Sequence, residues 1–437
     1  MMQYDSIAAL AAPAAFGAGV ATGAAMLNRK LFNKIEHGLR RTLWGAVPHG
    51  ATTPAPQDAA RRALQRAAME LRTPYFDAES RAKLRRIKLW YPQALCARAL
   101  EISHRYDGHN ASLSALVDFY NRYIDAYGNF RHTGILRFPD NCMHGWTVAY
   151  MHACTGEERY RHCTDVFASF LAGLNRSTSG LIPYRKTLPS LLLVDTVGMI
   201  CPFLARYGAL IRKPEAINDA VAHALDIIDN AMDCRSGLPF HGHVDKGAPV
   251  GIAGWARGTG WFLLGLAGIL EYLPPDHDAG EKLKDTVRRM AKKLRAFQRS
   301  DGCWGWAITN PFSTPETSGT ALIAFSLLTT RLLGIIGEEH DALIHDAYRG
   351  VCNAMTTKGY VLGASGDCVY GPGVYPTKFS HQMWAQGAAA AFLTLYAHWR
   401  RSRYAADADS ERNESISTDE GKKSTTTGKA RGLGFRP

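Results

Sequence analysis

Apolar side chains recur at spacings of three and four residues along most of this 437-residue chain. That period places them on one face of a helix, whereas the strict alternation of a half-buried strand is rare here. We therefore expect an all-α protein. The predicted helices cover about 58–72, 79–105, 110–127, 141–154, 158–175, 192–208, 214–232, 258–272, 279–298, 317–335, 339–355 and 381–400.

A short turn recurs between these helices. Its copies "STSGLIPY", "CRSGLPFH", "RSDGCWGW" and "TTKGYVLG" contain Gly180, Gly237, Gly302 and Gly359, at spacings of 57, 65 and 57 residues. A helix hairpin with its loops fills about that length, and a repeated period normally marks one supersecondary unit used several times. Six such hairpins closed in a ring predict an (α/α)6 barrel over 57–404. Loops at one end of the ring would line a cleft, where function concentrates.

Both ends of the chain differ from this body. Residues 6–28, inside the segment 1–56, carry no charge and could span a bilayer, yet Ala and Gly dominate them and Pro13 interrupts them. The basic stretch "RKLFNKIEHGLRR" follows, so the positive-inside rule keeps the body cytoplasmic. A soluble helix packed on the barrel, contact with an anionic inner-membrane surface and a cleaved signal all stay open. Residues 405–437 are polar and typical of a disordered tail.

Composition and charge narrow the function classes. The chain is 46% hydrophobic and 21% charged, which is ordinary for a globular protein. The net charge of +12 is concentrated in 28–105, which hold sixteen Lys or Arg against six Asp or Glu. No nucleic-acid motif accompanies this excess, so we expect no nucleic-acid partner. The nine cysteines are scattered without CxxC pairs, which predicts reduced, mostly buried thiols in the cytosol and neither a metal nor another cofactor.

Two aspartates stand at the starts of predicted helices, in "RFPDNCMHGW" (Asp140) and "LLLVDTVGMI" (Asp195). Asp is a favoured N-cap residue, so either carboxylate could be a structural cap. Asp195 follows four apolar residues, and burial there would disfavour its charged form and keep a proton available. We interpret Asp195 as a proton donor and leave Asp140 open between a cap and a catalytic group.

Two further stretches suggest ligand binding. In "SGLPFHGHVDKG", His241 directly follows a glycine turn, which favours a place in the cleft wall. A metal site made with His243 would lack further ligands. "GWARGTGW" places Trp255, Arg257 and Trp261 at the start of a helix, where the indoles offer flat faces and the guanidinium can pair with a carboxylate. This set suits an acidic sugar, and the alternative is a helix entry with packed aromatic side chains.

Four motifs together carry a family resemblance. In chain order, "VDTVGMICPFLARYG", "GLPFHG", "GWARGTGW" and "PETSGTALIAFSLL" resemble signatures of unsaturated glucuronyl and rhamnogalacturonyl hydrolases, glycoside hydrolase families 88 and 105, within about 110–400. The resemblance implies an (α/α)6 barrel that removes a terminal 4,5-unsaturated uronic acid from an acidic oligosaccharide by hydrating its vinyl ether. It implies Asp195 as general acid and base, Asp140 as second carboxylate, and His241, Arg257 and Trp261 around the terminal sugar.

The chain departs from the family pattern at two places. Leu193 stands where the family often has Trp two residues before the catalytic Asp. Tyr184 and Arg185 stand in the preceding loop, where the family often has His. These changes leave the acid in place and alter the walls of the site, so they affect substrate identity more than reaction type. Arg185 could add a second contact to an acidic group.

Two other functions stay open on the same barrel. It could carry a conventional glycosidase or polysaccharide lyase, because one fold hosts many activities. The missing Trp and His and the N-terminal segment favour instead a non-catalytic, membrane-associated carbohydrate-binding or polysaccharide-assembly protein. Hydration would remove the ultraviolet absorbance of the conjugated double bond, so this absorbance separates the hypotheses.

Overall fold

The computed structural model of the protein describes residues 53–72, 89–368 and 372–419, with side chains up to 403. The chain divides into two units, Met1–Ala51 and Thr52–Pro437. The first unit contains the apolar run and the basic stretch for which membrane contact is expected, and it lies outside the described residues. All described residues belong to the second unit.

Six helices of this unit form a closed inner ring. They are α5 (Tyr91–Asp107), α7 (Met143–Thr155), α9 (Val194–Ile211), α11 (Ala256–Leu270), α13 (Thr317–Leu332) and α15 (Met383–Asp419). Each packs against the next in chain order, and α15 returns to pack against α5. Because neighbours cover an inner helix on every side, fourteen of the fifteen residues of α11 are buried.

Glycines allow α9 and α11 to approach each other closely. A Cβ atom at Gly198 would lie 2.5 Å from the carbonyl oxygen of Trp261, and one at Gly265 would lie 2.6 Å from Cγ1 of Val197. Both separations are shorter than an ordinary carbon contact of about 3.5–4.0 Å. The two backbones therefore meet where no side chain fits, and this contact fixes the relative position of the helix starts.

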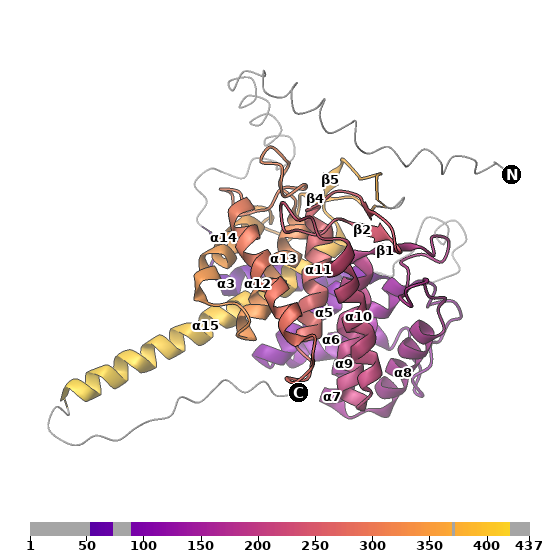
Figure 1. Ribbon diagram of the computed structural model, residues 1–437. Helices are drawn as coiled ribbons and strands as arrows, with labels where there is room; N and C mark the ends of the chain where they lie inside the picture. Colours follow the sequence, from indigo (N-terminus) through magenta and orange to yellow (C-terminus); the bar gives the residue numbers. More distant parts are fainter. Residues whose placement is uncertain (1–52, 73–88, 369–371, 420–437) are drawn as a thin grey trace. The chain divides into compact units, whose positions relative to one another are not determined.

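Six further helices surround the ring among the described residues. They are α3 (Pro56–Arg72), α6 (Asn110–Tyr120), α8 (Glu158–Ala172), α10 (Pro214–Asn230), α12 (Gly280–Phe297) and α14 (Asp341–Asn353). Each packs on inner helices, as α10 does on α9 and α11. They are amphipathic: α12 buries Leu283, Val287, Met290 and Leu294 and exposes most of its Lys and Arg. The two layers confirm the predicted (α/α)6 barrel (Figure 1).

The predicted glycine turn is present at all four positions. Gly180, Gly237, Gly302 and Gly359 have φ between 69° and 84°, the left-handed region that glycine adopts without steric cost. In each turn the glycine N–H donates to a carbonyl three or four residues earlier. The N–H of that earlier residue donates to the carbonyl of the residue after the glycine. Gly128 forms the same turn after α6, a fifth copy that the motif search missed because its flanking residues differ.

Short strands connect the loops at one end of the ring. β1 (Leu191–Leu193), β2 (Gly242–Val244) and β3 (Pro249–Val250) form an antiparallel sheet, and β4 (Ala364–Ser365) pairs with β5 (Phe379–Ser380). Strands of two or three residues are too short for alternation to be visible in the sequence. Figure 1 shows the labelled strands gathered at one end of the helices.

Two helix boundaries correct the sequence predictions. α5 begins at Tyr91, because Trp90 is extended and its N–H donates to Oε1 of Gln93. Residues 79–88 of the helix predicted over 79–105 lie outside the described residues. α15 continues to Asp419, so residues 405–419 are helical although a disordered tail was expected. Ala, Glu and Arg in this stretch are good helix formers, and extending an existing helix requires no new nucleus. Residues 420–437 of the expected tail lie outside the described residues.

One described helix, α9, is long and apolar enough to cross a membrane by length and composition. However, 83% of it is buried inside the barrel. An inner helix of a two-layer ring needs the same composition, because protein covers it on all sides. The apolar character of α9 is therefore explained by packing.

Candidate active site

All six inner helices begin at the end of the ring where the short strands lie. The first turn of α5 contacts α11 and α15 there, because the ring of Tyr91 lies 5.9 Å from Trp261 and 6.1 Å from Trp384. A helix N-terminus carries a partial positive charge. Six N-termini at one end of a ring therefore favour an anionic ligand at that end.

Asp195 and His241 are brought together by the small sheet. The register pairs Leu193 with Gly242, and the N–H of Val194 donates to the carbonyl of His241 at 3.0 Å. Nε2 of His241 lies 3.0 Å from Oδ2 of Asp195. The N-cap of α9 is Leu193, so the capping interpretation of Asp195 is wrong. The two predicted site residues, 46 positions apart in sequence, form one hydrogen-bonded pair.

A tyrosine that the sequence analysis missed, Tyr375, contacts the other ring nitrogen of His241. Oη of Tyr375 accepts a hydrogen bond from the N–H of Ile252 at 3.1 Å and lies 3.0 Å from Nδ1 of His241. An ionised Asp195 carboxylate can only accept, so Nε2 of His241 carries the proton that faces it. In the neutral imidazole Nδ1 then accepts a hydrogen bond from the Tyr375 hydroxyl. The chain of hydrogen bonds fixes both the tautomer and the orientation of the ring.

The tryptophans of the "GWARGTGW" run lie beneath the site. Trp255 packs on His241 and Tyr375, with ring centroids 4.5 and 5.3 Å apart, and Trp261 packs edge-on against Tyr91. Each of the two tryptophans is only 1% exposed. In this structure the indoles support the groups that line the site, and neither offers an open face to a sugar.

Arg257 is the second residue of α11, in its first turn. The sequence had predicted that this helix begins at 258. The side chain is buried, and its guanidinium donates to the carbonyls of Ser365 and Gly366 and to Oγ of Ser365, at 2.8–2.9 Å. The other side of Ser365 is held by Glu316, the N-cap of α13, whose carboxylate accepts the N–H of Ser365 at 2.9 Å. Arg257 therefore fastens the β4 loop over the helix starts.

Asp140 forms a second centre together with the residues that depart from the family pattern. It lies inside the short 3-10 helix η3 (Pro139–Cys142), whose N-cap is Phe138, so it does not act as a helix cap. Oδ2 lies 3.4 Å from both Oη of Tyr184 and Nη1 of Arg185, while Oδ1 is buried without a hydrogen-bond partner among the described residues. Burial raises the pKa of the Asp140 carboxyl, and the Arg185 charge opposes this effect without cancelling it.

A third carboxylate, Asp367, was missed by the sequence analysis. It follows β4 in a loop without periodicity, so no sequence signal marked it. Its side chain is solvent-accessible, yet burial by surrounding atoms raises its pKa, with Arg257 and Arg185 opposing the shift and the Asp195 charge adding to it. A side chain that solvent reaches although many protein atoms surround it is typical of a cleft wall. Asp140, Asp195 and Asp367 therefore share one electrostatic environment with two guanidiniums.

The two histidines of "HGH" have separate roles. His241 directly precedes β2 and His243 lies within it. Nε2 of His243 lies 2.6 Å from Asp226 on α10, while Nδ1 lies 2.9 Å from the carbonyl of Val244. Burial lowers the pKa of His243, but the hydrogen bonds to Asp226 and Val244 outweigh it, and the net shift is upward. His243 therefore belongs to a second carboxylate–imidazole pair.

The comparison with known protein families agrees with this geometry. Residues 67–403 match Glycosyl Hydrolase Family 88. The chain belongs to this family. The six-plus-six helical ring and the pair of Asp195 and His241 are thus features of a family 88 protein.

Two curated relatives and one solved structure illustrate the range of the likeness to family 88. The chain is 30% identical to an unsaturated 3S-rhamnoglycuronyl hydrolase of Alteromonas sp. strain LOR, over 29% of this chain and 31% of that protein. It is 23% identical to the unsaturated rhamnogalacturonyl hydrolase YesR of Bacillus subtilis strain 168, over 57% and 74%. A possible GH105 member from Klebsiella pneumoniae subsp. pneumoniae MGH 78578 superposes with a TM-score of 0.71 at 19% identity, over 81% and 96%. Identity this low supports the fold alone.

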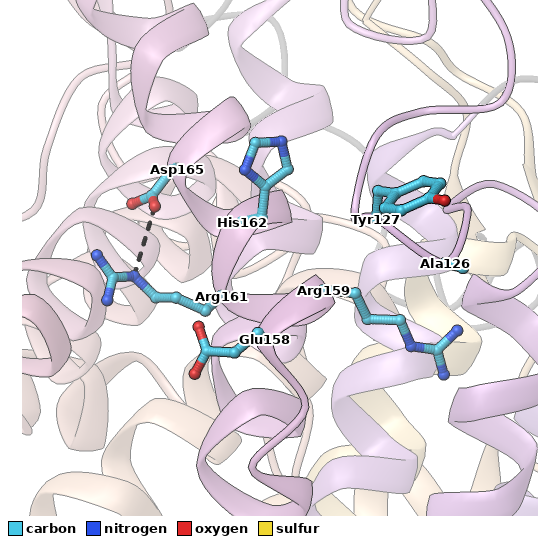
Figure 2. Close-up of a pocket in the computed structure, with 7 residues that line it drawn as sticks. All are labelled: Ala126, Tyr127, Glu158, Arg159, Arg161, His162 and Asp165. Carbon is cyan, nitrogen blue, oxygen red and sulfur yellow. Dashed lines mark ion pairs between the residues drawn. The ribbon is translucent and has the colours of Figure 1, made fainter.

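An open surface hollow of about 450 Å³ is lined by other residues than these (Figure 2). Seven residues from the segment after α6 and from the first turns of α8 line it: Ala126, Tyr127, Glu158, Arg159, Arg161, His162 and Asp165. Both arginines have partners, because Arg161 pairs with Asp165 at 3.5 Å and Arg159 with Glu157 at 2.7 Å. The hollow contains none of Asp140, Asp195 and His241, and the candidate active site is therefore the cluster at the helix starts.

Proposed function

We propose that the protein removes a terminal 4,5-unsaturated uronic acid from an acidic oligosaccharide by hydrating its vinyl ether. The observation that carries the proposal is the pair of Asp195 and His241 at the starts of the inner helices, with a second carboxylate, Asp140, whose charge acts on the same neighbours as that of Asp195, namely Tyr184 and Arg185. The partial positive charge of these termini suits an acidic sugar. The names of the two curated relatives, both unsaturated glycuronyl-type hydrolases, support the same class of substrate.

Asp195 acts as general acid and then as general base in this proposal. His241 occupies Oδ2 of Asp195, so Oδ1 is the oxygen that transfers the proton to C4 of the sugar. The C4–C5 π electrons form the new C4–H bond, and the cation at C5 is stabilised by the ring oxygen. Water adds to C5 and returns a proton to Asp195, so the carboxyl is regenerated.

The remaining steps need no further proton from the protein. The hemiketal at C5 opens by breaking its bond to the ring oxygen, and the hemiacetal then exposed at C1 releases the next sugar as an alcohol. One water is consumed, and the unsaturated sugar becomes a keto acid. Asp140, whose pKa is raised by burial, is suited to hold the attacking water while Asp195 takes its proton.

The test is the absorbance of the conjugated double bond during incubation of the full-length protein with lyase-generated unsaturated oligosaccharides. Hydration removes the absorbance while free sugar appears. A conventional glycosidase would release sugar and leave the absorbance unchanged, and a non-catalytic binding protein would do neither. Either of these two results on the whole panel would refute the proposal.

A further inference from the structure

The two arginines of the site, Arg257 and Arg185, differ in how many of their guanidinium N–H groups already bond to the protein. Arg257 is 2% exposed and directs three hydrogen bonds at the β4 loop. The Arg185 side chain is 32% exposed. Among the described residues, its hydrogen bonds come from Nη1 alone, to the carbonyl of Tyr184 at 3.0 Å and to Asp140 at 3.4 Å. Nε and Nη2 of Arg185 are thus the donors that an anion can reach.

The guanidinium of Arg185 is held in a fixed plane. Its Cζ atom lies 3.8 Å from the ring centroid of Tyr184 and 4.8 Å from that of Phe138. A flat, pre-oriented guanidinium can bind an oxyanion with two parallel hydrogen bonds. Its contact with Asp140 is longer than the ~2.7–2.9 Å of a charge-assisted hydrogen bond. Arg185 therefore keeps most of its binding capacity although a carboxylate lies nearby.

Exposure orders the groups by depth in the site. Asp140 is 2% exposed and contacts Arg185, and the Asp195 side chain is 10% exposed. Arg185 and the 39%-exposed Phe138 lie on the outer side. The sugar that reacts must reach the buried acid, so a group that meets Arg185 belongs to the sugar behind it.

Electrostatics decides what kind of group this is. Asp140, Asp195 and Asp367 would repel a second acidic group, unless a cation with available donors faces it. Arg185 provides that cation. We propose that Arg185 selects substrates that carry an oxyanion, either a sulfate ester or a carboxylate, on the sugar next to the terminal unsaturated uronic acid. This inference rests on the proposed function, and its test separates the two.

The experiment compares three unsaturated disaccharides that differ only at one position of the second sugar: a hydroxyl, a sulfate ester or a carboxylate. For each protein, kcat/KM on each charged disaccharide is divided by kcat/KM on the neutral one. Any effect of Arg185 on Asp140 changes all three values and cancels in the ratio. The variants are Arg185→Gln, Arg185→Lys and the control Arg176→Gln. Arg176 is matched, since its side chain is 31% exposed and pairs with Asp219 at 2.6 Å.

We expect at least one ratio to fall about tenfold or more in Arg185→Gln, the loss of one charge-assisted hydrogen bond, and to fall less in Arg185→Lys, which keeps the charge. The disaccharide whose ratio falls identifies sulfate or carboxylate as the ligand. Arg176→Gln should leave both ratios unchanged. Ratios that do not change in Arg185→Gln would overturn the inference. If the native protein leaves every absorbance unchanged, the hydrolase proposal fails, and the same ratios are then taken from dissociation constants measured by calorimetry.

Discussion

Asp195→Asn separates catalysis from stability at the centre of the site. The amide keeps an oxygen that accepts the Nε2–H of His241, now at 3.0 Å from Oδ2, but it cannot cycle a proton. Exchanging a charged acceptor for a neutral one costs about 1 kcal/mol of folding free energy. Domains are stable by about 5–15 kcal/mol, so the variant stays folded.

The expected loss of turnover is much larger than this cost. General acid–base catalysis contributes about 10²–10⁴-fold, which corresponds to about 2.7–5.5 kcal/mol of activation free energy. A protein destabilised by about 1 kcal/mol remains almost wholly native and cannot lose 10²-fold of its turnover by unfolding. We therefore expect kcat to fall at least ~10²-fold, while substrate binding survives.

A matched control is the second carboxylate–imidazole pair of the protein. Asp226 and His243 form a second pair at 2.6 Å, with side-chain exposures of 12% and 1% against 10% and 2% for Asp195 and His241. Asp226→Asn should change Tm about as much as Asp195→Asn does and leave turnover near the native value.

The assay follows the loss of double-bond absorbance, and binding is measured separately by calorimetry. Near-normal turnover in Asp195→Asn would refute the proposed chemistry. Equal losses of turnover in Asp195→Asn and Asp226→Asn would show that any broken carboxylate–imidazole pair has this effect, and the reasoning from proton transfer would then be wrong.

Four further predictions follow from individual contacts. Arg257→Ala removes three hydrogen bonds to the β4 loop and should lower Tm and raise KM together; a raised KM at unchanged Tm would contradict the anchoring role. Gly302→Ala should lower the free energy of unfolding by well over the ~1–3 kcal/mol of backbone strain, since its Cβ would lie 1.9 Å from a backbone oxygen. A Cβ at Gly180 meets no atom, so Gly180→Ala should lower it by the strain alone, and urea unfolding measures both. Burial lowers the pKa of His144 to about 3, against about 6.5 in an unfolded chain; stability should fall by up to about 1.4 kcal/mol per pH unit as pH drops below ~6.5, and His144→Gln should flatten this slope in a series of Tm measurements. We propose that residues 1 to about 45 bind anionic lipid, so a chain beginning at Thr53 should float less with anionic liposomes, and equal flotation would exclude the idea.

Local pattern was enough to predict the helices and the turns. The three-to-four-residue period of apolar side chains depends only on residues close together in the sequence. The bounds of α8, α10 and α12 accordingly agree with prediction to within three residues. The glycine turn was recognisable because its backbone needs a positive φ that few other residues adopt. The free thiols also followed from the sequence, and six of the nine cysteines are buried: Cys96, Cys142, Cys163, Cys201, Cys303 and Cys352.

The sequence pointed to several chemical groups without placing them relative to one another. Asp195 and His241 stood out because each adjoins an apolar run or a turn, but the β1–β2 register decided that they touch. Arg257 and Trp261 were expected to face a sugar. Packing of α11 against its neighbours buried both instead, and residue type alone does not reveal such burial.

Only the tertiary structure brought Tyr375 and Asp367 to the site, and only it showed that Arg185, which the sequence had placed in the site wall, contacts Asp140. All three lie in loops, where no period marks the side that a residue faces, and where position is set by contacts with distant segments. Tyr375 reaches His241 from 134 residues away because α15 closes the ring against α5 and carries the preceding loop across the helix starts. Ring closure is a property of all twelve helices together, so no single stretch of sequence contains it.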